Sequence, residues 1–248
     1  MEESKHKFPT ETIELPSKGL IYPEDNPLSS GTVEMKYMTA KEEDILSNQS
    51  YIQNGTVLDK LLKALIVSKV NYSDLIVGDK NAVMVAARIL GYGKDYKFEY
   101  KGEEVEVDLS TLENKEFDES SIVQGVNEFK FTLPNSGTEL TYKLLNHKDE
   151  MAIEAELKGL KKINKTADPS ISTRMKQMII SVNGDDERKT VREFVDTYFL
   201  ASDARAFRKH VAEHQPDVNL STQIELNDGM EDVDIPINVT FFWPDANL

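Results

Sequence analysis

The sequence predicts an α+β fold in which helical units and antiparallel β-hairpins occupy separate stretches of the chain. Apolar residues recur every three or four positions in some stretches, as in 57–66, and alternate with polar residues in others, as in 96–109. Turn-forming residues separate these stretches, which is typical of segregated elements. With 248 residues and 39% hydrophobic content, the chain is long enough to bury a core in one or two domains.

Residues 1–38 are predicted to form an extended arm that contains a hairpin. Proline and glycine are frequent in this region, and they flank two short β-like runs at 12–15 and 32–37. Such an arm has two alternatives, which the sequence leaves open. It packs on the helices that follow it, or it offers a strand to a partner by β-augmentation.

Residues 39–93 are predicted to form a helical unit. Thr39 and Glu42 fit a capping box, in which each side chain bonds the backbone of the other residue at a helix start. Asp79 fits the N-cap of a later helix, and Gly91 and Gly93 are suited to end that helix because glycine tolerates positive φ.

Residues 94–146 are predicted to form a β-rich insert. Alternating apolar residues on both sides of a Lys101–Gly102 turn indicate one hairpin, and a second such pattern spans 129–144 around a Pro-Asn-Ser-Gly turn. The sequence leaves open whether this insert is a separate domain or one wall of a shared core.

Residues 147–216 are predicted to form a second helical unit, which Pro216 ends. Helical spacing occurs in four segments, namely 147–162, 170–182, 190–199 and a last helix that Ser202 or Asp203 caps and that runs through His214.

Residues 217–248 are predicted to form a C-terminal hairpin with an aromatic tail. Alternating residues flank an Asn227–Asp228–Gly229 turn. The tail holds Phe241, Phe242 and Trp243, and large aromatic side chains either close a core or anchor an interface. We expect Phe241 or Phe242 to pack in the core and Trp243 to be the better candidate for a partner's pocket.

Composition excludes several classes of function. There is no cysteine, so the chain has no disulfides and no thiolate ligands or nucleophiles. The start of the sequence is charged, so we expect no export signal there. No apolar run is long enough to span a membrane, so we do not expect an integral membrane protein. Because 29 Lys and Arg face 44 Asp and Glu, for a net charge of −15, nucleic-acid binding is not expected.

One motif matches an enzyme class. His210, Glu213 and His214 fit the H-x-x-E-H pattern of inverted zinc peptidases, in which two histidines four positions apart share a helix face. The motif precedes Pro216 and a predicted hairpin, where no acidic helix offers a third ligand. The alternative is that these histidines and nearby basic residues favour the helix macrodipole. No other catalytic motif occurs, so we expect a non-enzymatic protein with no metal or other cofactor.

Several ordered segments carry a resemblance to a known family. They are ELPSKGLIYP (14–23), VEMKYMTAKEEDIL (33–46), FTLPNSGTELTYKLL (131–145), MKQMIISVNGD (175–185), FVDTYFLASDARAFRKHV (194–211), PDVNLSTQIEL (216–226) and VDIPINVTFFWP (233–244). Together they resemble the baseplate hub assembly proteins of T-even-type contractile-tailed bacteriophages. The terminal hairpin departs from relatives that carry a C-x-x-C knuckle, so any metal role of that knuckle is not expected here.

The resemblance implies a protein that binds phage baseplate hub proteins and assists their assembly in the host cytoplasm. An alternative within the same family is a structural hub subunit that stays in the virion baseplate, and the metal-dependent hydrolase is the alternative from another class. The oligomeric state stays open. The candidate partner-binding residues lie in the arm and in the aromatic tail, and they are Leu15, Leu20, Tyr22, Phe241, Phe242 and Trp243.

Overall fold

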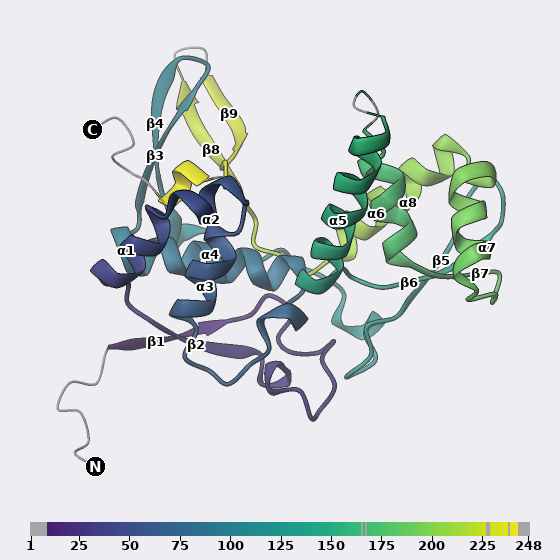
Figure 1. Cartoon of the computed structure of the whole chain (residues 1–248), viewed down its shortest axis with the longest axis horizontal. Helices are drawn as coiled ribbons and strands as arrows, with labels where there is room; N and C mark the ends of the chain where they lie inside the picture. The colour runs from purple at the N-terminus through teal and green to yellow at the C-terminus, as the bar shows by residue number, and fades with distance from the viewer. Residues whose placement is uncertain (1–8, 165, 167, 227–228, 238, 243–248) are drawn as a thin grey trace.

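The structure is a computed structural model that describes residues 9–164, 166, 168–226, 229–237 and 239–242. Its helices and small antiparallel sheets are segregated along the chain, so the predicted α+β class is confirmed. Figure 1 shows two lobes. We call the described residues within 9–108 and 219–242 the first lobe and those within 129–214 the second lobe. Within the described chain, no helix is both long enough and apolar enough to cross a membrane.

The first lobe contains a helical layer and three hairpins. Its helices are α1 (Ala40–Leu46), α2 (Gln49–Gln53), α3 (Val57–Leu65) and α4 (Val77–Tyr92), with a short 3-10 helix, η6 (Val239–Phe242), near the end of the chain. Its hairpins pair β1 (Thr10–Glu14) with β2 (Thr32–Lys36), β3 (Asp95–Tyr100) with β4 (Glu103–Asp108) and β8 (Ser221–Leu226) with β9 (Gly229–Asp234). Figure 1 places the last two hairpins beside each other, above the helices.

The second lobe packs four helices beside one three-stranded sheet. The sheet has the order β5 (Phe129–Thr132), β6 (Glu139–Tyr142) and β7 (Ile179–Val182), and all of its pairs are antiparallel. The helices are α5 (His147–Ile163), α6 (Ser170–Met178), α7 (Arg188–Glu193) and α8 (Ala201–His214), and a π-helical turn, η5 (Phe194–Tyr198), continues α7. The two hairpins of residues 94–146 therefore lie in different lobes (Figure 1).

The N-terminal arm packs on the first lobe through a buried carboxylate. Asp79 accepts hydrogen bonds from the Ser17 N–H at 2.9 Å, the Ser17 hydroxyl at 2.7 Å and the Tyr22 hydroxyl at 2.6 Å. Burial raises the pKa of the Asp79 carboxyl, against these three bonds that favour its charged form. The arm is thus fixed to α4 by its loop as well as by its strands.

Two predicted helix caps are wrong for the same physical reason. α4 begins at Val77, two residues before Asp79, and the Asp79 carboxylate bonds the arm instead. α8 begins at Ala201, so neither Ser202 nor Asp203 is its cap. The buried Asp203 carboxylate accepts from the backbone N–H groups of Asn135 at 2.9 Å and Ser136 at 3.0 Å, in the turn between β5 and β6. In both cases a segment distant in the sequence supplies the hydrogen-bond donors that the carboxylate accepts.

Other local predictions hold, with two exceptions. The capping box of Thr39 and Glu42 is confirmed, as is the end of α4 at Gly93, where φ is 84°. Gly91 does not end the helix as predicted, because it lies within α4 and Tyr92 is the last helical residue. The predicted helix over 170–182 is wrong in its last part, because α6 ends at Met178 and β7 follows directly. Ile179 lies opposite Tyr142 of β6, and this pairing completes the sheet.

The two segments that connect the lobes, residues 109–128 and 215–218, contact each other where the chain returns from α8 to the first lobe. The Lys115 N–H donates to the Asp217 carbonyl at 2.8 Å, and the Asn219 N–H donates to the Glu113 carbonyl at 2.8 Å. Gly78, in the first turn of α4, lies against this strand so closely that a Cβ atom there would be 1.9 Å from the Pro216 carbonyl oxygen. The junction therefore depends on direct backbone contact.

Candidate partner-binding groove

An open apolar groove lies between α6 and α8 in the second lobe. Along α6, Ile171, Met175 and Met178 recur at helical spacing on one face, and Phe207 and Val211 of α8 lie opposite them. The groove has a volume of about 280 Å³. Its full lining is Lys115, Ile171, Arg174, Met175, Met178, Phe207, Arg208, Val211, Ala212, Gln215 and Asp217.

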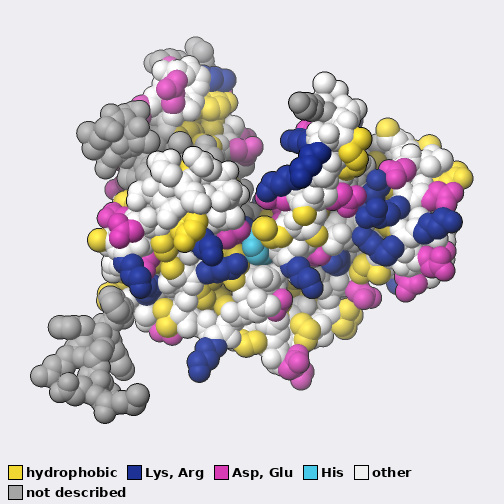
Figure 2. Space-filling model, viewed as in Figure 1, with side chains coloured by type: hydrophobic (Ala, Val, Ile, Leu, Met, Phe, Trp, Pro, Cys, Tyr) yellow, Lys and Arg dark blue, Asp and Glu magenta, His cyan; other side chains and the backbone are white. Residues whose placement is uncertain are grey.

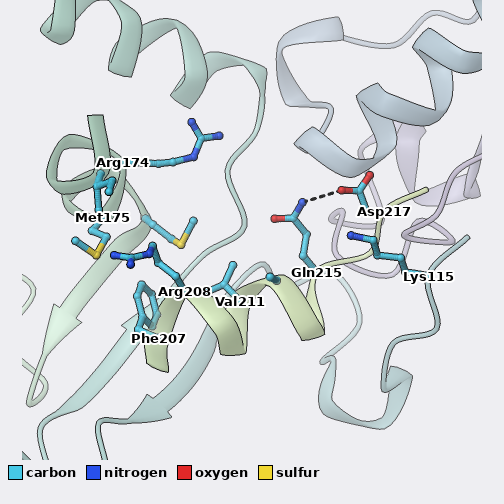
Figure 3. Close-up of a pocket in the computed structure, with 11 residues that line it drawn as sticks. Lys115, Arg174, Met175, Phe207, Arg208, Val211, Gln215 and Asp217 are labelled. Carbon is cyan, nitrogen blue, oxygen red and sulfur yellow. Dashed lines mark hydrogen bonds between the residues drawn. The ribbon is translucent and has the colours of Figure 1, made fainter. Parts of the chain in front are cut away.

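Figure 3 shows how these side chains are arranged. Met175, Arg174, Arg208 and Phe207 gather at one end, and Gln215, Asp217 and Lys115 lie at the other, near the junction of the lobes. Polar side chains therefore lie at both ends of the groove, and Val211 lies between them. This is the usual anatomy of a protein-binding site.

The groove is apolar without being closed. Met175 and Phe207 are buried in its floor, whereas the side chain of Ile171 is 54% exposed at its edge. Ala212 is also exposed, and its small side chain leaves the middle of the groove open. Methionine side chains adapt to differently shaped partners because they are unbranched and polarisable. Such a surface suits an apolar segment of another protein.

The rim of the groove carries positive charge. Arg174 forms an ion pair with Glu150 of α5. Arg208 and Lys115 are exposed, and neither forms an ion pair with another residue in the part of the chain that the structure describes. An acidic group that flanks an apolar partner segment would therefore meet at least two available cations.

The groove was not among the sequence predictions. Its two walls were recognised as helices, but which faces meet depends on the fold of the lobe. A signal was present, since Ile171, Met175 and Met178 form an apolar stripe on a helix whose other residues are mostly polar.

The predicted partner-binding residues lie mostly in the core. Leu15, Tyr22, Phe241 and Phe242 are each at most 4% exposed, and Leu20 is partly buried. The arm thus packs on the helices that follow it, which is the first of the two alternatives given for it. Both phenylalanines pack in the core, where at least one of them was expected. Trp243 lies outside the described residues, as does the predicted Asn227–Asp228 turn. Whether any of these residues also contacts a partner stays a prediction.

The histidines of the H-x-x-E-H motif are engaged in packing and local contacts. The His210 ring stacks on Phe131 with 4.3 Å between ring centroids, and burial, together with the nearby His214, lowers the pKa of His210. A ring nitrogen of His214 lies 2.8 Å from the His210 carbonyl oxygen, and Glu213 forms an ion pair with Lys209 at 3.6 Å. Among the described residues, no group of three His, Asp or Glu side chains is placed to hold a metal ion.

A cluster of titratable side chains joins the lobes at the start of α5. His147 Nε2 lies 3.5 Å from an Asp59 carboxylate oxygen of α3, and Lys80 Nζ of α4 lies 3.1 Å from Asp59 and 3.3 Å from His147 Nδ1. Tyr72 donates to Asp59 at 2.9 Å and packs its ring against His147. Burial and the positive charge of Lys80 lower the pKa of His147, so its neutral form is favoured.

Comparisons of the chain with protein-family models, with curated proteins and with solved structures gave no match.

Proposed function

We propose that this protein is a non-enzymatic assembly factor that binds a subunit of a phage baseplate hub. The groove between α6 and α8 is the site at which it holds an apolar segment of that subunit. The observation that supports this proposal most is an open groove with apolar walls from two helices, a methionine floor and a cationic rim. The segments that resemble baseplate hub assembly proteins support the identity of the partner. In this role the protein acts in the host cytoplasm during tail assembly.

The physical chemistry of the groove fits a reversible contact. Burial of an apolar segment contributes about 25 cal/mol for each Å² removed from water. A groove of this size provides a few anchor positions rather than a large permanent interface, which would bury thousands of Å². An assembly factor needs such a balance, because it must release its partner.

Blocking the groove tests the proposal. Ala212→Trp places an indole in the middle of the groove on an exposed helix position, so the fold should tolerate it. We expect capture of the hub subunit by the tagged protein, after co-expression with candidate hub subunits, to fall at least about tenfold. Ala155→Trp is the matched control, since Ala155 is exposed on α5 and does not line the groove. It should capture as much partner as the wild type.

A second pair of variants tests the cationic rim. Arg208→Glu reverses a charge at the groove, and Lys189→Glu makes the same change on an exposed position of α7. Only the first should weaken capture. The proposal is wrong if no hub subunit is captured, or if folded Ala212→Trp protein, checked by circular dichroism, captures as much as the wild type.

A further inference from the structure

A polar hollow of about 360 Å³ lies between β4 and β8 in the first lobe. All six residues of β4 line it, as do residues 222–224 of β8. Neighbouring residues in a strand point their side chains to opposite faces. A hollow lined by consecutive residues is therefore bounded by the edges of the two strands, where backbone N–H and C=O groups lie.

The turn of the β3–β4 hairpin determines which backbone groups of β4 face the hollow. Both residues of the two-residue loop, 101–102, have positive φ, which identifies a type I′ turn between Tyr100 and Glu103. The two residues that flank such a turn exchange both backbone hydrogen bonds, and the two kinds of pair alternate along the strands. Glu104 and Glu106 are thus in non-hydrogen-bonded pairs and direct their backbone groups away from β3.

The same reasoning applies to β8. The Ile235 N–H donates to the Leu220 carbonyl at 2.7 Å, so this pair is hydrogen-bonded. Counting along the register, in which Gln223 pairs with Asp232, Gln223 directs its backbone groups away from β9. No backbone hydrogen bond joins β4 to β8 in the described part of the chain. Two open strand edges therefore border one hollow.

The acidic side chains beside the β4 edge favour a partner that carries positive charge. Glu104 and Glu106 are exposed, and their carboxylates lie 3.0 Å and 3.7 Å from the amine of Lys97 on β3. A lysine on a neighbouring strand thus reaches both carboxylates. A second copy of this chain that paired edge to edge through β4 would instead place these glutamates close together, which disfavours self-association.

We propose that the open edges of β4 and β8 form a docking site for an extended segment of another protein. The segment adds a strand through backbone hydrogen bonds to the outward groups of Glu104, Glu106 or Gln223, and it places Lys or Arg side chains beside the two glutamates. This site is separate from the groove between α6 and α8 and does not depend on the function proposed for that groove.

A capped peptide of about ten residues that alternates lysine and valine tests this site. Binding is measured by fluorescence anisotropy, and the bound position by the amide NMR shifts of β4 and β8. We expect the peptide to bind the wild type and to shift the amides of residues 103–108 or 221–224. Glu106→Pro removes one outward N–H group without breaking a bond to β3, and it should weaken binding about fivefold to tenfold.

Three controls separate strand pairing from charge attraction and from binding in the groove. The same peptide with N-methyl groups on alternate amides keeps its charge but loses half of its donors, so it should bind at least about fivefold more weakly. Glu106→Gln removes the charge alone and should weaken binding less than Glu106→Pro does. Ala212→Trp, which blocks only the groove, should bind the peptide as the wild type does.

Several results would overturn the proposal. The proposal is wrong if the peptide does not bind, or if the NMR shifts are confined to residues outside β4 and β8. If the N-methylated peptide binds as tightly as the unmodified one, charge attraction alone explains the binding. Dimers of the free protein that Glu106→Pro abolishes would show that the edge serves a second copy instead.

Discussion

His147 has neighbours from several elements of the first lobe, although it belongs to α5 of the second. Asp59, Tyr72 and Lys80 surround its ring, and the side chain is almost fully buried. A buried imidazole next to an ammonium group is disfavoured in its charged form. The ring can accept a hydrogen bond from Lys80 only while it is neutral. The contact between the lobes at this point is therefore sensitive to protonation.

This environment predicts how stability depends on pH. The folded-state pKa of His147 is lowered from its ordinary value of about 6.5, so the unfolded chain takes up the proton first as the pH falls. The contribution of His147 to the free energy of unfolding is complete above about pH 6.5 and is lost as the pH falls through the lower folded-state pKa. His147→Gln should lose less stability than the wild type between about pH 7.5 and about pH 5.5.

Urea denaturation at both pH values measures this difference. His210, whose pKa is also lowered, titrates in the same range but is present in both proteins, so its contribution cancels in the comparison. An equal loss of stability in the two proteins would mean that folding does not lower the pKa of His147.

At the scale of elements, two helical glycines that look alike in the sequence differ in their surroundings. Only one of them lies where α4 closely approaches the chain that returns from α8. Gly78 and Gly159 both lie in helices, and helical glycine costs about 1 kcal/mol relative to alanine. A Cβ at Gly78 would collide with the Pro216 carbonyl oxygen, whereas a Cβ at Gly159 would meet nothing within 4 Å. The two positions should therefore respond to the same substitution in opposite directions.

We expect Gly159→Ala to raise the free energy of unfolding by about 0.5–1 kcal/mol. Gly78→Ala should lower it by about 2 kcal/mol or more, because the backbone of the junction has to move. Thermal and urea denaturation of both variants measure these effects. A stabilised Gly78→Ala protein would show that the lobes are not joined by this contact.

Elements whose signals are local could be predicted from the sequence. The β3–β4 hairpin follows from alternating residues around Lys101–Gly102, and the start of α1 follows from Thr39 and Glu42. β7 could not be predicted, because its residues continue the spacing of α6 and become a strand only by pairing with β6. The groove and the open strand edges were missed for a related reason. Each of them depends on how separate elements are placed in space.

At the scale of the whole molecule, the charge is divided unequally between the lobes. Residues 129–214 carry 15 Lys and Arg against 13 Asp and Glu, whereas residues 9–108 and 219–242 carry 11 against 22. Figure 2 shows basic side chains gathered over the second lobe on this face. The net charge of −15 therefore does not describe the surroundings of the groove. An acidic partner segment is not repelled there, and a basic strand is attracted to the acidic first lobe.

The measurement that tests the central claim most directly is hydrogen–deuterium exchange of the protein alone and in complex with the captured hub subunit. Binding in the groove predicts slower exchange in peptides that cover 171–178 and 207–215, because a bound segment orders both walls. Protection in β4 or β8 alone would place the partner at the strand edges and contradict the groove. Unchanged exchange in both walls of the groove, in a complex shown to be intact, would contradict the claim that this protein holds its partner between α6 and α8.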